Sequence, residues 1–486
     1  MNKEADSYRK NIIDKGDEGS ALWNKISAPT LKNSSNVKVL QPGMNGIAVI
    51  RIPEDHYALV HASTGNPDAK DIAEHTGSLV DRLVSAAISI GATPIGLGND
   101  FNSSTGELSV IERAGKGLVD RADYHGVAVM NGENAILGTR VNGEANILGA
   151  MVSMIPKKSA PFGDSTKVFR HNDAVFAVFD PQGRAIYVNN DGNGTKLEFN
   201  EKSGELQLGL SDSAAMKLDD LIKIGASARV IADVVETNKP ISMTQLETEA
   251  QRLGKKYGFT YLLHPEVVGD RIRGYKDGAF AVNIGGTAVS VIDEERLKNP
   301  LKPEAGDFLV AIRGEPNTRS NGESARREIL SGRLGLEWHT TTQGEDFLRY
   351  FVRPSTILYG VFRELIAQGV ATSVYHMSGG AYKGKLAIPL AKHGLFVEMD
   401  ELFPLPDVER KFLELASTSA EKSYGTWPMG TDGFITTRSY EAAKPIIRAQ
   451  GLEEKKVGQL CYGPDGRTGV KLRAWNGQDV YFSGKD

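Results

Sequence analysis

The segment NDGNGTK, at residues 190–196, contains the residue types that bind phosphate oxygens. It follows a strand-like run directly, and Gly192 and Gly194 allow positive φ angles that turn backbone N–H groups toward an anion. Thr195 adds a hydroxyl group and Lys196 adds a mobile positive charge. The spacing differs from that of the P-loop, GxxxxGK[ST]. A phosphate-binding segment and an ordinary turn after a strand are both open interpretations of these residues alone.

Four aspartates in or after this segment are candidate ligands for a divalent cation. Asp191 lies within the segment, Asp233 ends a predicted strand at 230–234, and Asp219 and Asp220 are adjacent in a predicted helix. Carboxylate oxygens are hard ligands that suit Mg²⁺. Because adjacent helical residues point in different directions, one of the helical pair can be solvated while the other faces a metal. A solvated acidic helix face is the alternative interpretation.

A further acid, Glu266, follows His264 and Pro265 after a predicted strand at 259–263. Sheets of α/β proteins bind ligands at the carboxyl ends of their strands, so Glu266 is a candidate catalytic residue. For His264 the alternative is a buried histidine with a structural role.

The elements that carry these residues repeat an earlier part of the chain. A predicted helix at 214–224 ends at Gly225 in DDLIKIGAS, as a helix at 78–90 ends at Gly91 in SAAISIGAT. Agreement in the order of elements favours duplication over chance similarity of two α/β segments. The predicted strands are 46–52, 57–61, 127–130 and 145–155 in the first copy, and 174–179, 185–189, 230–234, 259–263 and 280–292 in the second.

The chain is therefore expected to be an α/β protein with four parts. These are a polar arm and linker at 1–44, the first copy at 45–160, the second copy at 170–300, and a distinct C-terminal α/β domain at 301–486. A long helix at 349–368 is predicted in the C-terminal domain.

The first copy lacks the residues that make the second a candidate site. It has HASTGNPDAK in place of the glycine-rich segment, and Ser85 and Ala86 at the positions of Asp219 and Asp220. This difference predicts one working site and one that has lost its function.

Composition excludes several classes of protein. The 486 residues include 53 glycines and a single cysteine, and the net charge is -4. The charge argues against a nucleic-acid partner, and the lack of a long apolar run argues against a membrane span. The charged N-terminus is unlike a secretory signal, and one cysteine excludes an internal disulfide. These features predict a cytoplasmic protein.

The motifs resemble those of the aminoimidazole ribonucleotide synthetase (phosphoribosylformylglycinamidine cyclo-ligase) family. DGNGTK resembles the family's Asp-Gly-Val-Gly-Thr-Lys segment, and LDDLIKIGA resembles its Asn-Asp-Leu helix, which places the acidic position on Asp220. Asp233 matches an acid in the family's next strand, and Glu266 falls near the Glu of its Gly-Gly-Glu motif. GDFLVAIRGEPNTRSNG, HMSGGA and WPMGTDGF resemble three later segments, so the resemblance covers residues 174–486.

The resemblance implies an ATP-dependent ligase with Mg²⁺ as cofactor, which converts formylglycinamidine ribonucleotide to aminoimidazole ribonucleotide in purine biosynthesis. It implies that ATP phosphorylates an amide oxygen of the substrate. The implied nucleotide-binding residues are Asp191, Gly192, Gly194, Thr195, Lys196, Asp220 and Asp233; the implied metal ligands are Asp191, Asp220 and Asp233; and the implied catalytic residues are Lys196, Asp191 and Glu266.

The resemblance also implies a substrate side and an assembly. The partner is a small phosphorylated ribonucleotide, and the implied residues that bind it are Ser320, Asn321, Gly322, His376, Ser378, Gly379 and Gly380. In the family, two N-terminal domains from two subunits pair into a β-barrel. The two copies in this chain are therefore expected to pair as an internal pseudo-dimer with one competent site, and a homodimer in addition stays open.

Three departures from the family put the substrate in doubt. Arg319 stands where the family has His, Pro428 where it has Asn, and His264-Pro265 where it has Gly-Gly. Two alternatives therefore stay open: a related ATP-dependent enzyme that acts on another amide or acid, as formylglycinamidine synthetase does, and a non-catalytic nucleotide-binding homologue.

Overall fold

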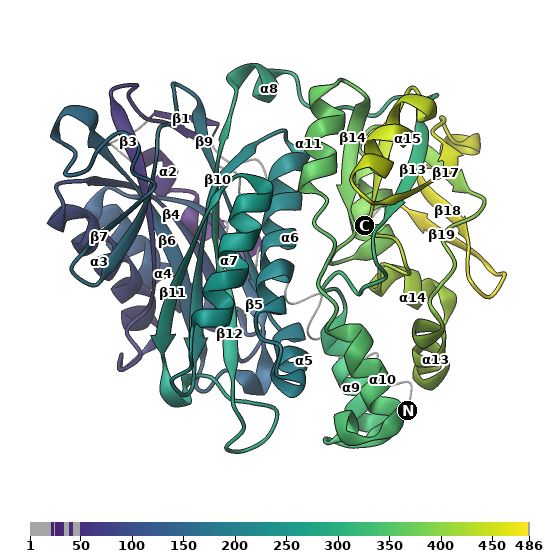
Figure 1. The fold of residues 1–486 in the computed structure, drawn as a ribbon, viewed down its shortest axis with the longest axis horizontal. Helices are drawn as coiled ribbons and strands as arrows, with labels where there is room; N and C mark the ends of the chain where they lie inside the picture. The colour runs from purple at the N-terminus through teal and green to yellow at the C-terminus, as the bar shows by residue number, and fades with distance from the viewer. Residues whose placement is uncertain (1–20, 24, 34–37, 42–48, 485–486) are drawn as a thin grey trace. The chain divides into compact units, whose positions relative to one another are not determined.

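The computed structural model describes residues 21–23, 25–33, 38–41 and 49–484 (Figure 1). The chain divides into two compact units. Unit 1 comprises Met1–Glu201 with Ala226–Leu297, and unit 2 comprises Lys202–Gly225 with Lys298–Asp486. Both units mix helices and strands, so the predicted α/β class is confirmed. Within the described ranges, every helix is too short or too polar to cross a bilayer.

Unit 1 contains two six-stranded sheets. The strands of the first sheet are β3 (His56–Thr64), β4 (Thr93–Ser103), β5 (Ala128–Ile136), β6 (Ala145–Pro156), β7 (Val168–His171) and β8 (Ala174–Phe179), in the order β5-β4-β6-β3-β8-β7. Those of the second are β1 (Lys38–Gln41), β2 (Val49–Arg51), β9 (Ala185–Asn193), β10 (Ser227–Thr237), β11 (Thr260–Val267) and β12 (Val282–Ile292), in the order β1-β2-β9-β12-β10-β11.

The four central strands have the same topology in both sheets. The order β3-β6-β4-β5 repeats as β9-β12-β10-β11. The pairs β4–β5 and β10–β11 are parallel, and the other central pairs are antiparallel. This agreement confirms the predicted duplication.

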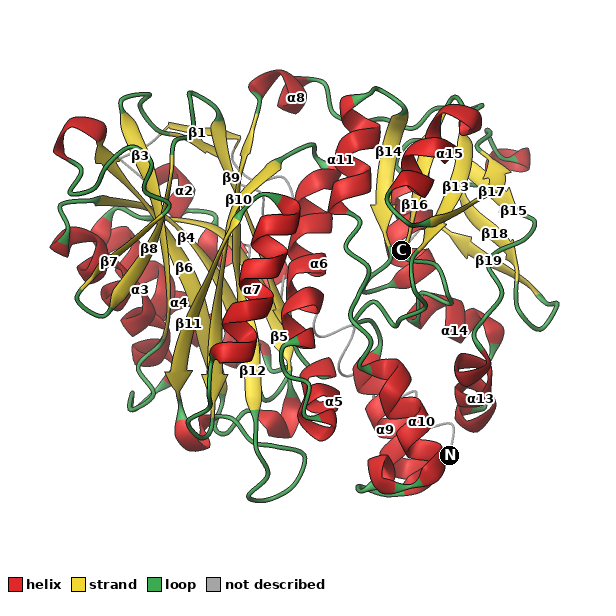
Figure 2. Cartoon of the chain, viewed as in Figure 1, coloured by secondary structure: helices red, strands yellow, loops and turns green. Residues whose placement is uncertain are grey.

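Helices follow matching strands in the two copies. In the first copy, α3 (Ile72–Ser89) and α4 (Leu108–His125) pack on their own sheet (Figure 2). In the second, α7 (Thr244–Tyr257) packs on β11, whereas α6 (Leu208–Lys223) belongs to unit 2. Gly91 and Gly225 follow α3 and α6 with φ of 75° and 78°, which favour glycine, as the repeat predicts.

The outer strands are exchanged between the copies, which differs from the prediction. The run at 46–52 was expected in the first copy's sheet, but β2 pairs with β9 of the second copy. The run at 174–179 was expected in the second copy's sheet, but β8 pairs with β3 of the first. Apolar periodicity shows that a segment is a strand but does not select the edge to which it bonds.

The two sheets face each other and share one apolar core. Val60 and Ala150 from the first sheet lie in the same buried cluster as Val188 and Val234 from the second. Because side chains alternate along a strand, these residues define the inner face of each sheet. The ladders among the described strands stay within each sheet, so the predicted pairing into a β-barrel is not confirmed.

Part of the predicted polar arm packs into the first copy. Trp23 is 1% exposed, and its ring stacks on Phe101 of β4 with centroids 4.9 Å apart. A short helix, α2 (Thr30–Asn33), and β1 also fall within residues 1–44. Residues 1–20 of the arm lie outside the described part.

Unit 2 contains two smaller sheets and most of the remaining helices. Its strands are β13 (Phe308–Arg313), β14 (Ala371–His376), β16 (Gly433–Thr437) and β17 (Glu453–Gln459), in the order β14-β16-β13-β17, and β15 (Phe396–Met399), β18 (Gly469–Arg473) and β19 (Asp479–Ser483). Its helices after α6 include α9 (Glu323–Leu334), α10 (Thr342–Phe351), α11 (Tyr359–Ala367), α12 (Ile388–Ala391), α13 (Asp407–Ala416), α14 (Ala420–Thr426) and α15 (Tyr440–Ala449). Two short helices precede them in sequence, α5 (Lys196–Ser203) and α8 (Glu294–Lys298), and each spans a boundary between the units.

The helix predicted at 349–368 is two helices, α10 and α11. Pro354 lies between them. Proline has no N–H group to donate and its ring clashes with the preceding turn, so it ends the first helix although the apolar pattern continues.

Candidate active site

Asp191 and Asp233 lie in one row across the second sheet of unit 1. Asp191 of β9 is the register partner of Gly286 of β12, and Gly286 is in turn the partner of Asp233 of β10. Register partners project their side chains to the same face, so the two carboxylates share a face two strand spacings apart, about 10 Å. Tyr261 donates its hydroxyl proton to Oδ2 of Asp233 at 2.7 Å.

Gly286 keeps the space between these carboxylates open. A Cβ at this position would lie 2.7 Å from Oδ1 and 2.8 Å from Cα of Asp233. Any side chain at Gly286 would therefore fill the place between Asp191 and Asp233.

The glycine-rich segment has a different backbone from the one predicted. Asp191 and Gly192 continue strand β9, and neither Gly192 nor Gly194 has a positive φ. Gly192 is required for a different reason: a Cβ there would collide with the buried carboxylate of Asp100 on the facing sheet. The glycine thus permits close approach of two sheets and not a left-handed turn.

Lys196 begins helix α5 directly after this strand. The turn is formed by Gly194 and Thr195, whose carbonyl groups accept hydrogen bonds from Leu197 N at 3.1 Å and Glu198 N at 3.1 Å. Lys196 is 1% exposed. Lys196 is therefore a buried cationic residue that follows the strand of Asp191 directly.

The first copy has the same row without the acids. Ser63, Gly149 and Asn99 are register partners across β3, β6 and β4. A Cβ at Gly149 would lie 3.1 Å from Cα of Asn99, which matches the crowding at Gly286. The glycine is therefore shared by both copies, whereas the two carboxylates belong to the second.

Glu266 lies on the opposite face of the second sheet. It is the register partner of Glu236, which is three residues from Asp233 and so projects to the other side. Glu266 contacts Arg82 and His264, each at 3.4 Å. The structure therefore does not bring Glu266 together with Asp191 and Asp233.

Glu236 was missed by the sequence analysis and is the more buried acid. Its carboxylate accepts hydrogen bonds from Thr64 at 2.6 Å and Asn146 at 2.5 Å in the first copy, and from Asn283 at 2.8 Å in the second. Burial raises its pKa. These bonds join the inner faces of the two sheets, which indicates a structural role.

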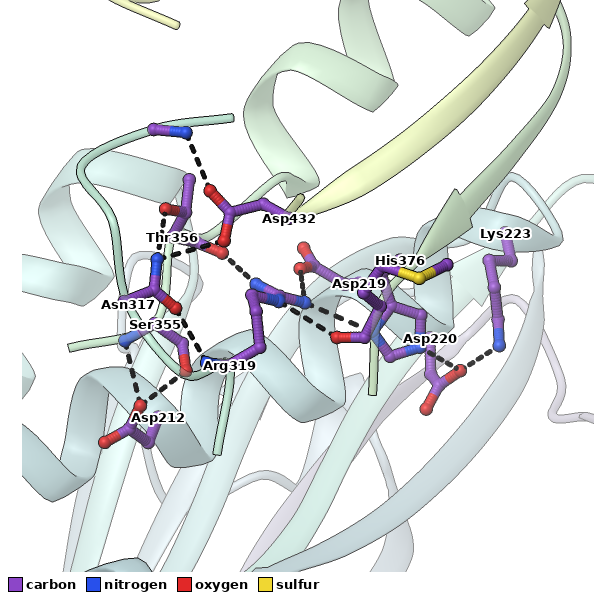
Figure 3. Close-up of polar contacts among 12 residues, drawn as sticks. Asp212, Asp219, Asp220, Lys223, Asn317, Arg319, Ser355, Thr356, His376 and Asp432 are labelled. Atoms are coloured by element: carbon purple, nitrogen blue, oxygen red, sulfur yellow. Dashed lines mark hydrogen bonds and ion pairs between the residues drawn. The ribbon is translucent and has the colours of Figure 1, made fainter. Parts of the chain in front are cut away.

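In unit 2, the adjacent acids of α6 have separate partners (Figure 3). Asp219 is fully buried and forms an ion pair with Arg319 at 2.9 Å. Asp220 forms an ion pair with Lys223 and accepts a hydrogen bond from His376 at 3.0 Å. Of the adjacent pair, Asp219 is thus fully buried, whereas the side chain of Asp220 is 21% exposed, and both have charged or polar partners.

Arg319 connects three segments of unit 2. Its guanidinium donates to the carbonyl groups of Met377, at 3.1 Å, and Thr356, and to Nδ1 of His376 at 3.2 Å. Since Nδ1 of His376 accepts, its Nε2 carries the proton and donates to Asp220. Burial lowers the pKa of His376 to about 3, so the ring is neutral.

The predicted substrate-side residues converge around this network. Asn321 donates its amide to the carbonyl groups of Ser378, at 2.8 Å, and Thr426, at 2.9 Å. Non-glycine residues with positive φ lie close in sequence to Asn321, Ser378 and Thr426. They are Arg319 at 54°, Ser320 at 49°, Ala381 at 41° and Met429 at 50°. Backbone strain of this kind concentrates at functional sites.

Three glycines complete the predicted substrate side. Gly322 has φ of 71°, and a Cβ there would lie 2.5 Å from the Trp427 ring. Gly380 has φ of 80°, and a Cβ at Gly379 would meet open space. The structure thus brings Ser320, Asn321, Gly322, His376, Ser378, Gly379 and Gly380 into one region of unit 2.

The predicted metal ligands are divided between the units. Asp191 and Asp233 belong to unit 1, and Asp220 belongs to unit 2. Among the residues that the structure describes, no three His, Cys, Asp or Glu side chains are gathered as a metal site. Mg²⁺ in nucleotide enzymes is held by one or two carboxylates together with phosphate oxygens, so the pair Asp191–Asp233 meets this requirement.

Comparisons with known proteins agree with the predicted resemblance. No family model matches the chain. The phosphoribosylformylglycinamidine cyclo-ligase of Clostridium perfringens is 24% identical over 290 residues, which cover 58% of this chain and 82% of the relative. That of Thermococcus kodakarensis is 26% identical over 297 residues, covering 59% and 83%. Among solved structures, T. maritima PurL complexed with FGAR is 14% identical with a TM-score of 0.41, covering 66% of this chain and 47% of PurL.

Proposed function

We propose, from the homology of the chain with the phosphoribosylformylglycinamidine cyclo-ligases, that it is an ATP-dependent ligase that forms aminoimidazole ribonucleotide. The observation that carries the proposal is the row Asp191–Gly286–Asp233 in the second copy. The equivalent row of the first copy holds Ser63 and Asn99. This difference supports one competent nucleotide site in an internal pseudo-dimer.

The proposed reaction has two steps. The γ-phosphoryl group of ATP is transferred to the amide oxygen of formylglycinamidine ribonucleotide, and ADP leaves. An amine of the same substrate then attacks the activated carbon, the imidazole ring closes, and inorganic phosphate leaves. The protein's contribution is to position the reactants and to neutralise charge.

Residues of both units have roles in this proposal. Asp191 and Asp233, on either side of Gly286, would hold Mg²⁺, and the ion would neutralise phosphate charge. Lys196 stabilises negative charge on the transferred phosphoryl group. Asp220 accepts a hydrogen bond from Nε2 of His376 and so orients this ring on the substrate side.

The test measures phosphate release from ATP with and without formylglycinamidine ribonucleotide, with the product identified by mass spectrometry. Asp191→Asn is expected to reduce turnover by about 100-fold or more while the fold is retained. Ser63→Ala, at the equivalent position of the first copy, is the matched control and is expected to leave turnover unchanged. Full activity of Asp191→Asn would reject the assignment.

A second candidate function is favoured by Arg319. The cyclo-ligase motif has histidine at this position, and here an arginine is engaged with Asp219 and His376. A changed substrate side suits ATP-dependent activation of another amide or acid. Phosphate release that requires a different amide would support this candidate, and ATP binding without release would indicate a non-catalytic homologue.

A further inference from the structure

Two arginines occupy matching positions in the copies of unit 1. Arg140 ends a short 3₁₀ turn, Gly138–Arg140, after β5, and Arg271 ends the turn Gly269–Arg271 after β11. The sequences are GTR and GDR. Neither motif took part in the site described above.

The two turns contact each other reciprocally. Asn142 donates its N–H to the carbonyl of Arg271 at 2.8 Å, and Arg273 donates its N–H to the carbonyl of Arg140 at 2.8 Å. Val141 and Ile272, the residues that follow the arginines, form an antiparallel bridge. Such exchange of equivalent contacts is typical of an isologous interface, here between two copies on one chain.

The side chain of Arg140 crosses into the second copy and contacts α5. Its guanidinium donates to both carboxylate oxygens of Glu201, at 2.7 and 3.3 Å, and to the carbonyl of Val282 at 2.9 Å. Glu198 lies 3.8 Å away on the same face of the helix. The side chains of Arg140 and Glu201 are 7% and 3% exposed. Bidentate, buried pairs of this kind fix orientation as well as charge.

Arg271 crosses in the opposite direction to the first copy. Its guanidinium donates to the carbonyl groups of Pro67, at 2.6 Å, Asn66 and Ala69. This segment follows β3 as α5 follows β9, so the two arginines hold equivalent parts of the two copies. Arg140 holds the copy with the carboxylates, and Arg271 holds the copy without them.

We propose that Arg140, supplied by the first copy, is a positioning residue for the nucleotide site of the second copy. The inference rests on the proposed function, because it assigns ATP to the segment that ends in Lys196. Helix α5 has eight residues and would be marginal alone, so its orientation depends on tertiary contacts. Arg140 fixes the helix that begins at Lys196, which gives the first copy a role although it has lost its own acids.

The test compares variants at the two equivalent positions. Arg140→Met removes the contact, and Arg140→Met/Glu201→Gln removes it together with the carboxylate that it would leave unpaired. Arg140→Lys keeps the charge without the bidentate geometry. Arg271→Met is the matched control, because it removes the same type of side chain from the first copy's segment.

The expected result is a selective effect on the nucleotide. The double variant should raise KM for ATP about 10-fold, with KM for the ribonucleotide unchanged. Arg140→Lys should lie between this variant and the wild type, and Arg271→Met should keep the wild-type KM for ATP. Amide hydrogen exchange in residues 196–203 should accelerate in the double variant and not in Arg271→Met.

Two outcomes would overturn the inference. One is an unchanged KM for ATP in the double variant, and the other is unchanged exchange in residues 196–203. A wild-type protein that binds no ATP would refute the proposed function instead, and the exchange measurement would still decide whether Arg140 orders α5.

Discussion

At the scale of single residues, the candidate site depends on glycines, which have no side chain, as much as on charged residues. Gly286 leaves open the space between Asp191 and Asp233, and Gly192 allows the close approach of Asp100. The sequence motif at 190–196 indicated the glycines of this segment as candidate site residues. It did not predict why they are glycines, because a collision across two sheets depends on tertiary packing.

Gly286→Ala tests the open space directly. Its Cβ would press on the backbone of β10, so the free energy of unfolding should fall by about 2 kcal/mol. ATP binding should be lost as well, because the methyl group fills the space between the carboxylates. The matched variant Gly149→Ala should lose similar stability but bind ATP normally. Calorimetric titration and chemical denaturation of both variants check this, and equal ATP affinity in the two would contradict it.

His61 predicts a pH dependence of stability. It is 2% exposed, its Nε2 donates to the carbonyl of Leu83 at 2.8 Å, and burial lowers its pKa to about 4. The unfolded chain, with a histidine pKa of about 6.5, binds a proton in the window between these values while the folded protein does not. Stability should therefore fall as the pH falls, by about 2 kcal/mol between pH 7.5 and pH 5 from this residue alone.

The check is the unfolding free energy of the wild type and His61→Gln at both pH values. Glutamine keeps a donor for Leu83 but does not titrate. The variant should lose about 2 kcal/mol less than the wild type over this range. Equal losses would show that His61 does not contribute.

At the scale of elements, the apolar pattern predicted the existence of helices and strands better than their limits and partners. The strand predicted at 174–179 has the bounds of β8, and the strand predicted at 145–155 matches β6 to within one residue. The prediction at 349–368 failed at Pro354, where a local break interrupts a continuing apolar pattern. Pairing of β2 and β8 could not be predicted, since edge selection depends on contacts distant in sequence.

Helix α6 is linked to the rest of unit 2 by charge as well as by apolar packing. Arg319→Met would leave Asp219 buried without its partner, and the free energy of unfolding should fall by about 3–5 kcal/mol. Arg319→Met/Asp219→Leu removes both charges and should recover most of this loss. Denaturation curves give the unfolding free energy of each variant. Equal destabilisation of the two variants would show that lost packing, and not the unpaired charge of Asp219, explains the effect of Arg319→Met.

At the scale of unit 1, the exchange of strands makes the two copies depend on each other. The first sheet contains β7 and β8, which follow the connection at 160–167 in sequence. The second sheet contains β1 and β2, which precede it, and the inner faces of the two sheets share one core. Divergence of one copy is tolerated in such an arrangement, because the first copy still supplies core residues, edge strands and Arg140 to the second. This explains physically how the first copy can lack the acids of this row and still keep its glycine.

Cleavage of the connection between the copies tests this dependence. Gly163 lies in an exposed loop where a Cβ would meet open space, so a protease site inserted there should be tolerated. After cleavage, the N-terminal fragment would still pair through β3 with β8, and through β2 with β9, of the other fragment. The fragments should therefore elute together from gel filtration in native buffer and separate in denaturant. Separation in native buffer would contradict the exchanged pairing, because copies with strands confined to their own sheets have no ladder to hold them together.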